Sequence, residues 1–188
     1  MSDRISLRQD TGNGPIIVLL QAADAAPSPA VPALARDFRV QVYGVGPAAA
    51  AGDVIKAIAA AQPVALVATA AAARVALGLV LDEPGAVSAL ALIDPPQLDL
   101  ARDAAIADRL ASLTTPLLVL VGTRGAAGLP PSALLLRKAM PSCHIVFVYD
   151  AGEKLDDERP EAVAAALAEF ARSRERYLVT TRSGLLHP

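Results

Sequence analysis

Residues 64–81, which read VALVATAAAARVALGLVL, form the stretch around which the rest of this chain is organised. An apolar strand runs into a short Thr-Ala turn and then directly into an apolar helix. Many α/β enzymes hold a catalytic nucleophile on a turn of this kind, between a strand and a helix. In this chain the corresponding residue is Ala70, whose methyl group has no nucleophilic chemistry.

Apolar runs elsewhere in the chain extend the same pattern. Residues 16–20 (IIVLL) and 117–121 (LLVLV) are continuous apolar runs, which indicate strands covered on both faces. Further strands are predicted at 39–43, 87–93 and 145–149, with helices at 31–38, 53–61, 101–113, 132–140 and from Pro160 onward. Strands alternating with helices predict a mostly parallel central sheet of about six to seven strands with helices on both faces, a three-layer α/β/α fold.

Two local features refine this outline. Residues 5–8 suit a short strand, and the glycine-rich turn 10–15 (DTGNGP) after it tolerates positive φ, so an N-terminal hairpin is predicted. Asp53 is expected to cap the helix that follows it. Residues 44–46 (GVG) lack the third glycine of a dinucleotide fingerprint, and a turn is predicted there.

The length of the chain favours one domain. Its 188 residues hold a sizeable core, with residues 1–172 as a single domain and 173–188 as a C-terminal tail. Aromatic residues make up only 3%, so Val, Leu and Ile must fill the core. The tail is rich in arginine and is expected to be solvated or bound to a partner, and the segment from Tyr177 to Thr181 (YLVTT) can act as an edge strand.

Charge and cysteine content exclude several classes of function. A net charge of -2 gives no electrostatic reason to bind nucleic acid or an anionic membrane. The single cysteine, Cys143, permits no internal disulfide, and no Cys/His cluster has metal-ligand spacing. No stretch is long and uniformly apolar enough to span a bilayer. We therefore expect a soluble cytoplasmic protein without metal or cofactor.

Three longer strings carry a resemblance to a known family. Residues 64–96 (VALVATAAAARVALGLVLDEPGAVSALALIDPP), 114–125 (TTPLLVLVGTRG) and 150–171 (DAGEKLDDERPEAVAAALAEFA) are similar to the α/β-hydrolase superfamily, as is the order of the elements up to Arg172. The resemblance implies that these strings hold the nucleophile strand and helix, the strand that presents the acid, and the histidine loop with the last helix.

The same resemblance implies a catalytic triad that this chain does not have. In that family the nucleophile turn has the sequence G-x-S-x-G. Residues 68–72 of this chain read Ala-Thr-Ala-Ala-Ala, so Ala70 takes the place of the serine. The acid position holds Gly125 and the histidine position holds Glu153. The His-Gly of the oxyanion region is replaced by Gln21 and Ala22. The short span between Asp94 and Leu117 leaves room for one helix and none for a cap domain, so a shallow or open pocket is expected.

Other candidate sites have plainer explanations. Thr69 and Asp94 could form a substitute site, but Thr69 is one residue away from the nucleophile position and no histidine lies in a matching loop. Cys143 and His144 should point to opposite faces of a strand. The acidic run that contains Glu153 and residues 156–158 suits a solvated loop before a helix better than a divalent cation. With alanine in place of glycine and serine, the turn at Ala70 is expected to relax to negative φ.

Two functional hypotheses follow. The first is a non-catalytic binding or assembly module with the triad positions vacant. The alternative is an esterase-like hydrolase that acts on a small ester or acyl substrate with relocated or partner-supplied residues. The residues expected to line the former active-site position, and so to contact any ligand, are Gln21, Ala22, Thr69, Ala70, Ala71 and Asp94. A homo-oligomer or a protein partner is expected through the sheet edge from Ile145 to Tyr149 or through the tail from Tyr177 to Thr181.

Overall fold

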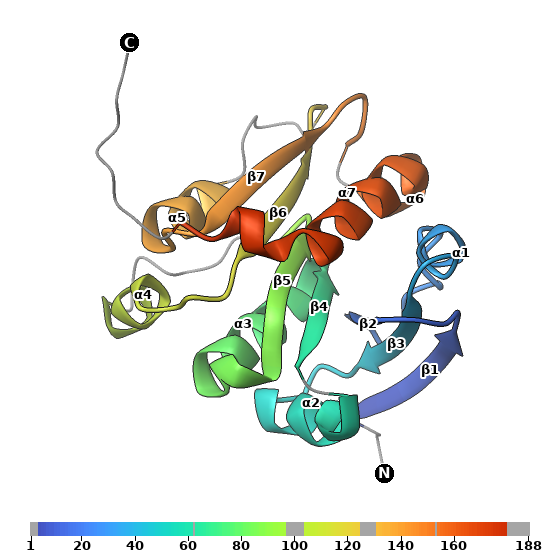
Figure 1. The fold of residues 1–188 in the computed structure, drawn as a ribbon, viewed down its shortest axis with the longest axis horizontal. Helices are drawn as coiled ribbons and strands as arrows, with labels where there is room; N and C mark the ends of the chain where they lie inside the picture. The colour runs from blue at the N-terminus through green and yellow to red at the C-terminus, as the bar shows by residue number, and fades with distance from the viewer. Residues whose placement is uncertain (1–3, 62, 97–103, 125–130, 153, 180–188) are drawn as a thin grey trace.

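Seven strands form one sheet in the order β1-β3-β2-β4-β5-β6-β7 (Figure 1). The computed structural model describes residues 4–61, 63–96, 104–124, 131–152 and 154–179. The strands are β1 (Ile5–Thr11), β2 (Ile16–Ala22), β3 (Arg39–Val45), β4 (Val64–Thr69), β5 (Val87–Ile93), β6 (Leu117–Gly122) and β7 (Cys143–Val148). All neighbouring pairs are parallel except β1 with β3.

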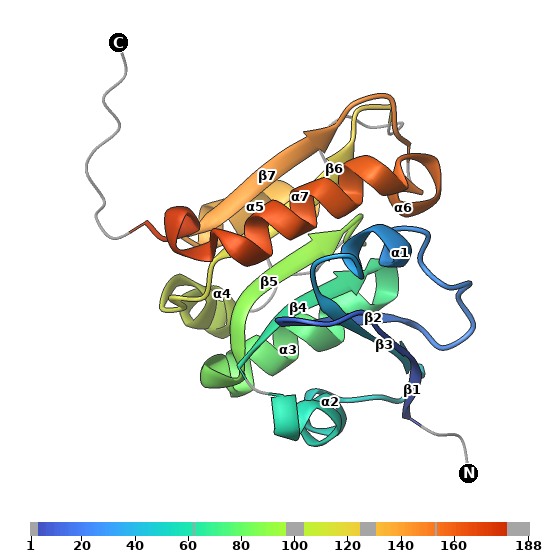
Figure 2. The same cartoon turned by 45° about the vertical axis from the view of Figure 1, so that its right-hand side comes forward.

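Helices cover both faces of this sheet. They are α1 (Val31–Leu34), α2 (Ala51–Ile58), α3 (Ala73–Asp82), α4 (Ala104–Ala111), α5 (Pro131–Ala139), α6 (Leu155–Glu158) and α7 (Pro160–Arg172). Buried residues of α1, α6 and α7 pack on one face, with α7 in front of the sheet in Figure 2, and those of α2 to α5 pack on the other. The predicted three-layer α/β/α architecture is therefore confirmed.

Strand β2 shows why its sequence is apolar without interruption. Ile17 and Leu19 pack into the core on the α7 side, while Val18 and Leu20 pack into the core on the α3 side. All four side chains are at most 1% exposed. A strand between two helical layers needs apolar side chains on both faces. Its sequence therefore lacks the alternation of apolar and polar residues that is typical of a strand with one exposed face. As predicted, most core side chains are Val, Leu, Ile and Ala.

The predicted N-terminal hairpin is wrong. Strand β1 does not pair with β2, which follows it in the chain, but runs antiparallel to β3 at the edge of the sheet. Both sides of β2 are already occupied, because β2 pairs with β3 on one side and with β4 on the other. The connection from β1 to β2 therefore passes the beginning of β3 rather than making a tight turn.

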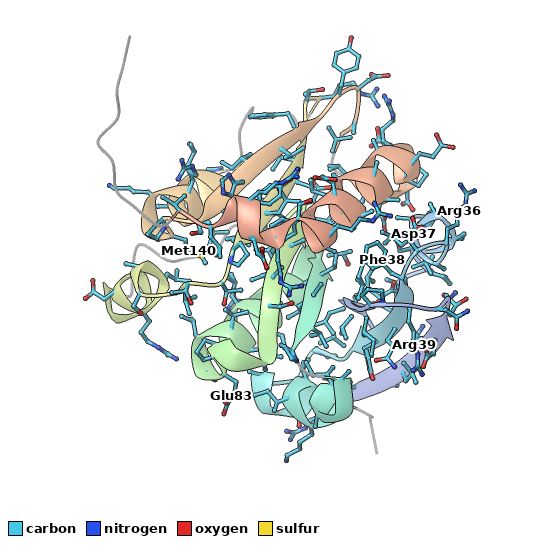
Figure 3. All side chains as sticks on the ribbon, in the orientation of Figure 1. Arg36, Asp37, Phe38, Arg39, Glu83 and Met140 are labelled. Atoms are coloured by element: carbon cyan, nitrogen blue, oxygen red, sulfur yellow. The ribbon has the colours of Figure 1, made fainter. Side chains whose placement is uncertain are left out.

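Two glycines make this crossing sterically feasible. Gly12 and Gly14 have φ of 80° and 104°, the positive values expected of this turn. A Cβ atom on Gly12 would lie 2.1 Å from the carbonyl oxygen of Phe38, and one on Gly14 would lie 2.9 Å from that of Asp37. Figure 3 labels Asp37 and Phe38 next to α1. Only a residue without a side chain allows the two backbone segments to approach this closely.

Several element boundaries differ from the prediction. Helix α1 ends at Leu34 instead of residue 38, and β3 continues through Gly44 and Val45, which pair with both β1 and β2. Asp53 is not the N-cap of α2. It lies in the first turn of that helix, where its Oδ2 accepts a hydrogen bond from the Ala50 N–H at 3.0 Å.

The chain after α7 returns to the start of β7. Tyr177 belongs to a short 3-10 helix (Arg174–Tyr177), and Leu178 and Val179 are not in a strand, so the described part of the YLVTT segment is not an edge strand. The Tyr177 ring makes edge contacts with Phe170 and His144, and the Val179 N–H donates to the Ser142 hydroxyl at 3.0 Å. None of the helices in the described ranges is long and apolar enough to cross a membrane.

Candidate functional site

The carboxyl ends of three parallel strands, β2, β4 and β5, lie side by side. Leu20 of β2 is the register partner of Ala68 of β4, and Thr69 of β4 is the partner of Ile93 of β5. The residues that follow these strands therefore meet. The chain leaves β2 toward β3 on one side and leaves β4 toward β5 on the other. Such a reversal of strand order opens a crevice beyond the carboxyl ends of the strands.

A cleft of about 320 Å³ lies at this place. It is lined by Gln21, Ala25, Ala26, Ser28, Pro29, Thr69, Ala70, Ile93, Asp94, Lys154, Leu155, Asp156 and Asp157. Four of the six residues expected at the site, Gln21, Thr69, Ala70 and Asp94, thus share one cleft. Ala22 lies instead in a neighbouring hollow with Val45 and Val75. The side chain of Ala71 is outside the part of the chain that the structure describes.

Ala70 adopts a left-handed backbone conformation. Its φ is 41°, so the prediction that the turn relaxes is wrong. Thr69 before it is still extended, with φ of -99° and ψ of 143°, and the Ala73 N–H after it already bonds to the Ala70 carbonyl oxygen. The chain has a single residue in which to change from strand to helix, and positive φ at that residue makes the change. The fold therefore imposes this conformation on a residue that does not favour it.

Gln21 supports the loop that borders the cleft. Its side chain is only 3% exposed. The Nε2 amide donates hydrogen bonds to the carbonyl oxygens of Ala25, at 3.3 Å, and Ala26, at 3.1 Å. A buried amide needs such partners because desolvation without hydrogen bonds is costly. These two bonds make Gln21 a support for the wall of the cleft.

Asp94 joins the end of β5 to α6. Its own φ is positive, at 45°, and its Oδ2 accepts a hydrogen bond from the Leu155 N–H at 3.1 Å. Thr69 and Asp94, the two residues of the suggested substitute site, both line the cleft. None of the described lining residues is a histidine, so none of them offers an imidazole to act as a base toward Thr69.

Asp156 carries a half-buried carboxyl group, although the sequence assigned it to a solvated run. Burial raises the pKa of Asp156, although hydrogen bonds from the Ser28 hydroxyl and the Ala30 N–H act in the opposite direction. Its Oδ1 atom is buried and has no hydrogen-bond partner within the described residues. Asp156 and Asp157 are adjacent acids in the sequence. They differ in that Asp156 is half-buried and bonds to Ser28 and Ala30, which are far away in the chain, whereas Asp157 is exposed.

The residues next to the two other vacant positions form a network of charges. Gly125 and Glu153 themselves lie outside the described residues. The Arg124 Nε lies 3.1 Å from Asp150 Oδ1, and its guanidinium also pairs with Glu158. The Gly152 N–H donates to Glu158 at 3.1 Å. The loops after β6 and β7 are thereby held together.

The surroundings of Cys143 and His144 test the prediction that the two side chains point to opposite faces of β7. The Cys143 thiol is fully buried on the α3 side of the sheet, and this burial raises its pKa to about 12. His144 points to the other face, where its Nε2 lies 2.9 Å from the Tyr177 carbonyl oxygen. The predicted opposite orientation is confirmed. Within the described ranges, no three His, Cys, Asp or Glu side chains are close enough to hold a metal ion.

Comparison with known proteins agrees on the fold. No protein-family model and no curated protein matches this sequence. Solved structures of α/β hydrolases do match. An α/β-hydrolase enzyme from the metagenome of lagoon sediments of Mar Chica, Morocco, aligns with a TM-score of 0.72 and 18% identity, over 90% of this chain and 99% of its own.

Two further structures give the same result. The 2-hydroxy-6-oxo-6-phenylhexa-2,4-dienoate hydrolase of a Rhodococcus species aligns with a TM-score of 0.72 and 14% identity, over 90% of this chain and 100% of its own. A thermophilic esterase from Thermogutta terrifontis aligns with a TM-score of 0.68 and 16% identity, over 93% and 94% of the two chains. The chain therefore has an α/β-hydrolase-like fold, as predicted. Likeness at these identities concerns the fold alone.

Proposed function

We propose that this chain is an α/β-hydrolase-fold protein without hydrolase activity, which serves as a binding or assembly module. The observation that carries the proposal is the alanine at residue 70. Ala70 lies in the turn between β4 and α3 with positive φ, which is where a hydrolase of this fold carries its serine. A methyl group cannot attack a carbonyl carbon, so acyl transfer lacks its first step.

The distribution of histidines supports the same proposal. A serine-type hydrolase needs an imidazole that takes the proton of the nucleophile. The chain has two histidines. His144 lies on β7, bonds to Tyr177 and does not line the cleft. His187 lies outside the described residues. Where the family resemblance expects the acid and the histidine, the sequence has Gly125 and Glu153.

An activity assay tests the absence of catalysis. Purified protein is incubated with p-nitrophenyl acetate and butyrate, and separately with a fluorophosphonate probe. We expect no turnover above a heat-denatured control and no covalent labelling. Stoichiometric labelling or burst kinetics would overturn the proposal. Because the labelling readout is independent of substrate choice, a negative result does not depend on having found the right ester.

The charges of the cleft suggest which ligands it accepts. Three carboxyl groups line it, those of Asp94, Asp156 and Asp157, against one ammonium group on Lys154. We expect a preference for a neutral or cationic small molecule over an anion. Benzylamine and benzoate share a ring and differ in charge, so they make a matched pair of probes. Benzylamine should shift the backbone amide resonances of Thr69 and Ala70, and a shift with benzoate alone would contradict the expectation.

A hydrolase with relocated residues is the second candidate. It is favoured by one observation, that the Thr69 hydroxyl and the Asp94 carboxyl line the same cleft. If the activity assay were positive, Thr69→Val should abolish turnover. A partner chain could alternatively supply the missing groups, and in that case Thr69→Val would leave the turnover of the complex unchanged.

Restoring the triad tests the assignment of the vacant positions. In the variant Ala70→Ser, Gly125→Asp, Glu153→His, the three side chains should come within hydrogen-bond reach in a crystal structure. Separations of several ångströms would show that the positions are misassigned.

We further propose that the protein lacks a cap domain and acts in the cytoplasm. Between Asp94 and Leu117 the described residues hold one helix, α4, and the single cysteine is buried and free.

A further inference from the structure

The two edge strands of the sheet differ in how well they are protected against pairing. Strands β1 and β7 lie at opposite ends of the sheet (Figure 1). Strand β1 carries charged residues, Arg8 and Asp10, and a bulge between Leu7 and Gln9. Charges and bulges on an edge strand discourage other strands from adding to it. Edge β1 is therefore protected.

Strand β7 has none of these features. Its sequence, CHIVFV, contains no acidic or basic residue other than His144 and no proline. Its register with β6 runs from Cys143 to Val148 without a shift. A regular, uncharged edge strand is the kind that pairs readily with a further strand. The asymmetry between the two edges singles out β7 as a surface for association.

The hydrogen bonds to β6 show which backbone groups of β7 face outward. The carbonyl oxygens of Ser142 and Val148 accept bonds from the N–H groups of Leu117 and Thr123, at 2.9 Å and 3.2 Å. In a parallel pair, alternate residues direct both their N–H and C=O groups to the same neighbour. The even-numbered residues thus face β6, and Ile145 and Phe147 direct their backbone groups away from it. Within the described ranges no strand lies on that side.

Large apolar side chains accompany this edge. Phe147 is 55% exposed, Tyr149 is 79% exposed and Leu134 of α5 is 52% exposed. Met140, labelled in Figure 3 between α5 and the start of β7, is only 1% exposed and does not add to this surface. Exposed aromatic residues at a rigid strand are typical anchors of protein interfaces. The edge therefore offers apolar area as well as backbone hydrogen-bonding groups.

We propose that the chain forms a twofold-symmetric homodimer in which β7 of one copy pairs antiparallel with β7 of a second copy. A second copy fits this edge because the edge is self-complementary. With the twofold axis at Val146, Ile145 of each copy lies opposite Phe147 of the other. Each pair exchanges two N–H···O bonds, which gives four in all. One continuous sheet then runs through both copies.

Charge favours the same antiparallel arrangement. Arg137 and Lys138 lie in the last turn of α5, just before β7 begins, and Asp150 follows its end. Antiparallel pairing brings the beginning of one β7 beside the end of the other. The basic turn of each copy then approaches Asp150 of its partner, a carboxylate that Arg124 of the same copy also pairs with, and this complementarity helps to fix the register. A parallel arrangement would bring like charges together.

The first test removes one outward N–H from each copy. Phe147→Pro leaves the bonds to β6 intact, since proline is tolerated where the strand N–H faces away from the ladder. Phe147→Val is the matched control that loses the ring but keeps the N–H. Light scattering after size-exclusion chromatography should show wild-type dimers at tens of micromolar protein. Losing two of four bonds should weaken the dimer about tenfold to a hundredfold in Phe147→Pro, and more than in Phe147→Val.

A second measurement covers the case in which the proline variant does not fold. Val146 of each copy faces its symmetry mate across a pair without hydrogen bonds, where Cα atoms lie about 4.5 Å apart. This spacing allows a disulfide, so Val146→Cys should cross-link into a dimer that a reductant reverses. Leu7→Cys on the protected edge is the control and should stay uncrosslinked.

Three outcomes would overturn the proposal. One is a wild-type protein that stays monomeric at tens of micromolar concentration. Another is slow hydrogen exchange of the Ile145 and Phe147 amides in a monomer, which would mean that the chain covers its own edge. Equal weakening by Phe147→Val and Phe147→Pro would also contradict pairing through the backbone.

Discussion

Replacing Ala70 with glycine is expected to stabilise the protein, because the residue is held at a φ of 41°. An L side chain in the left-handed region costs roughly 1–2 kcal/mol, which glycine avoids. Glycine also increases the conformational entropy of the unfolded chain, which lowers the free energy of unfolding by about 0.4–1 kcal/mol. The Ala70 methyl is exposed, so its removal loses little burial. The free energy of unfolding should therefore rise by about 1 kcal/mol.

Urea denaturation followed by circular dichroism measures this change. A matched control is Ala59→Gly, at an alanine that is also exposed and whose φ of -51° is helical. There glycine relieves no strain and should lower the free energy of unfolding by about 0.5–1 kcal/mol. The two substitutions are chemically identical and should have effects of opposite sign. If Ala70→Gly destabilises the protein as much as the control does, Ala70 is not strained in solution.

Three further predictions concern the fold and the cleft. Gly12→Ala should destabilise the protein by about 2 kcal/mol or more, as measured by thermal unfolding, because its Cβ would lie 2.1 Å from the Phe38 carbonyl oxygen at a φ of 80°. Cys143 should be inert to a thiol reagent at pH 8 and react stoichiometrically in denaturant, because burial raises its pKa to about 12; rapid reaction of the native protein would contradict this. Burial raises the pKa of Asp156 above 3.8, so its ionisation destabilises the fold as the pH rises. Asp156→Asn should increase the free energy of unfolding at neutral pH, and this gain should vanish below pH 3.8; a gain that persists in acid would refute the explanation.

The fold could be predicted from local patterns because most elements have a strong local cause. The run at 16–20 became β2, and the helix expected from Pro160 begins at that residue as α7. The pairing of β1 could not be predicted in the same way. It depends on which strands already flank β2, a property of the whole sheet that the turn 10–15 does not encode.

The site shows the same division between local and long-range causes. The resemblance to the α/β-hydrolase superfamily predicted that Gln21, Thr69 and Asp94 line one site, and the three residues share one cleft. The backbone of Ala70 was mispredicted because alanine by itself avoids positive φ, and the geometry of the strand-to-helix turn overrides that preference. Asp156 was missed because its hydrogen-bond partners, Ser28 and Ala30, are remote in the sequence.

The turn at Ala70 also has a consequence for protein engineering. In an enzyme, a strained turn is readily attributed to the reaction that it serves. Here the residue with the strained backbone has no reactive group. The strain is therefore a property of the fold and does not depend on a catalytic side chain. A designer who wants a new nucleophile in this scaffold therefore begins with the backbone already shaped and needs to supply only side chains.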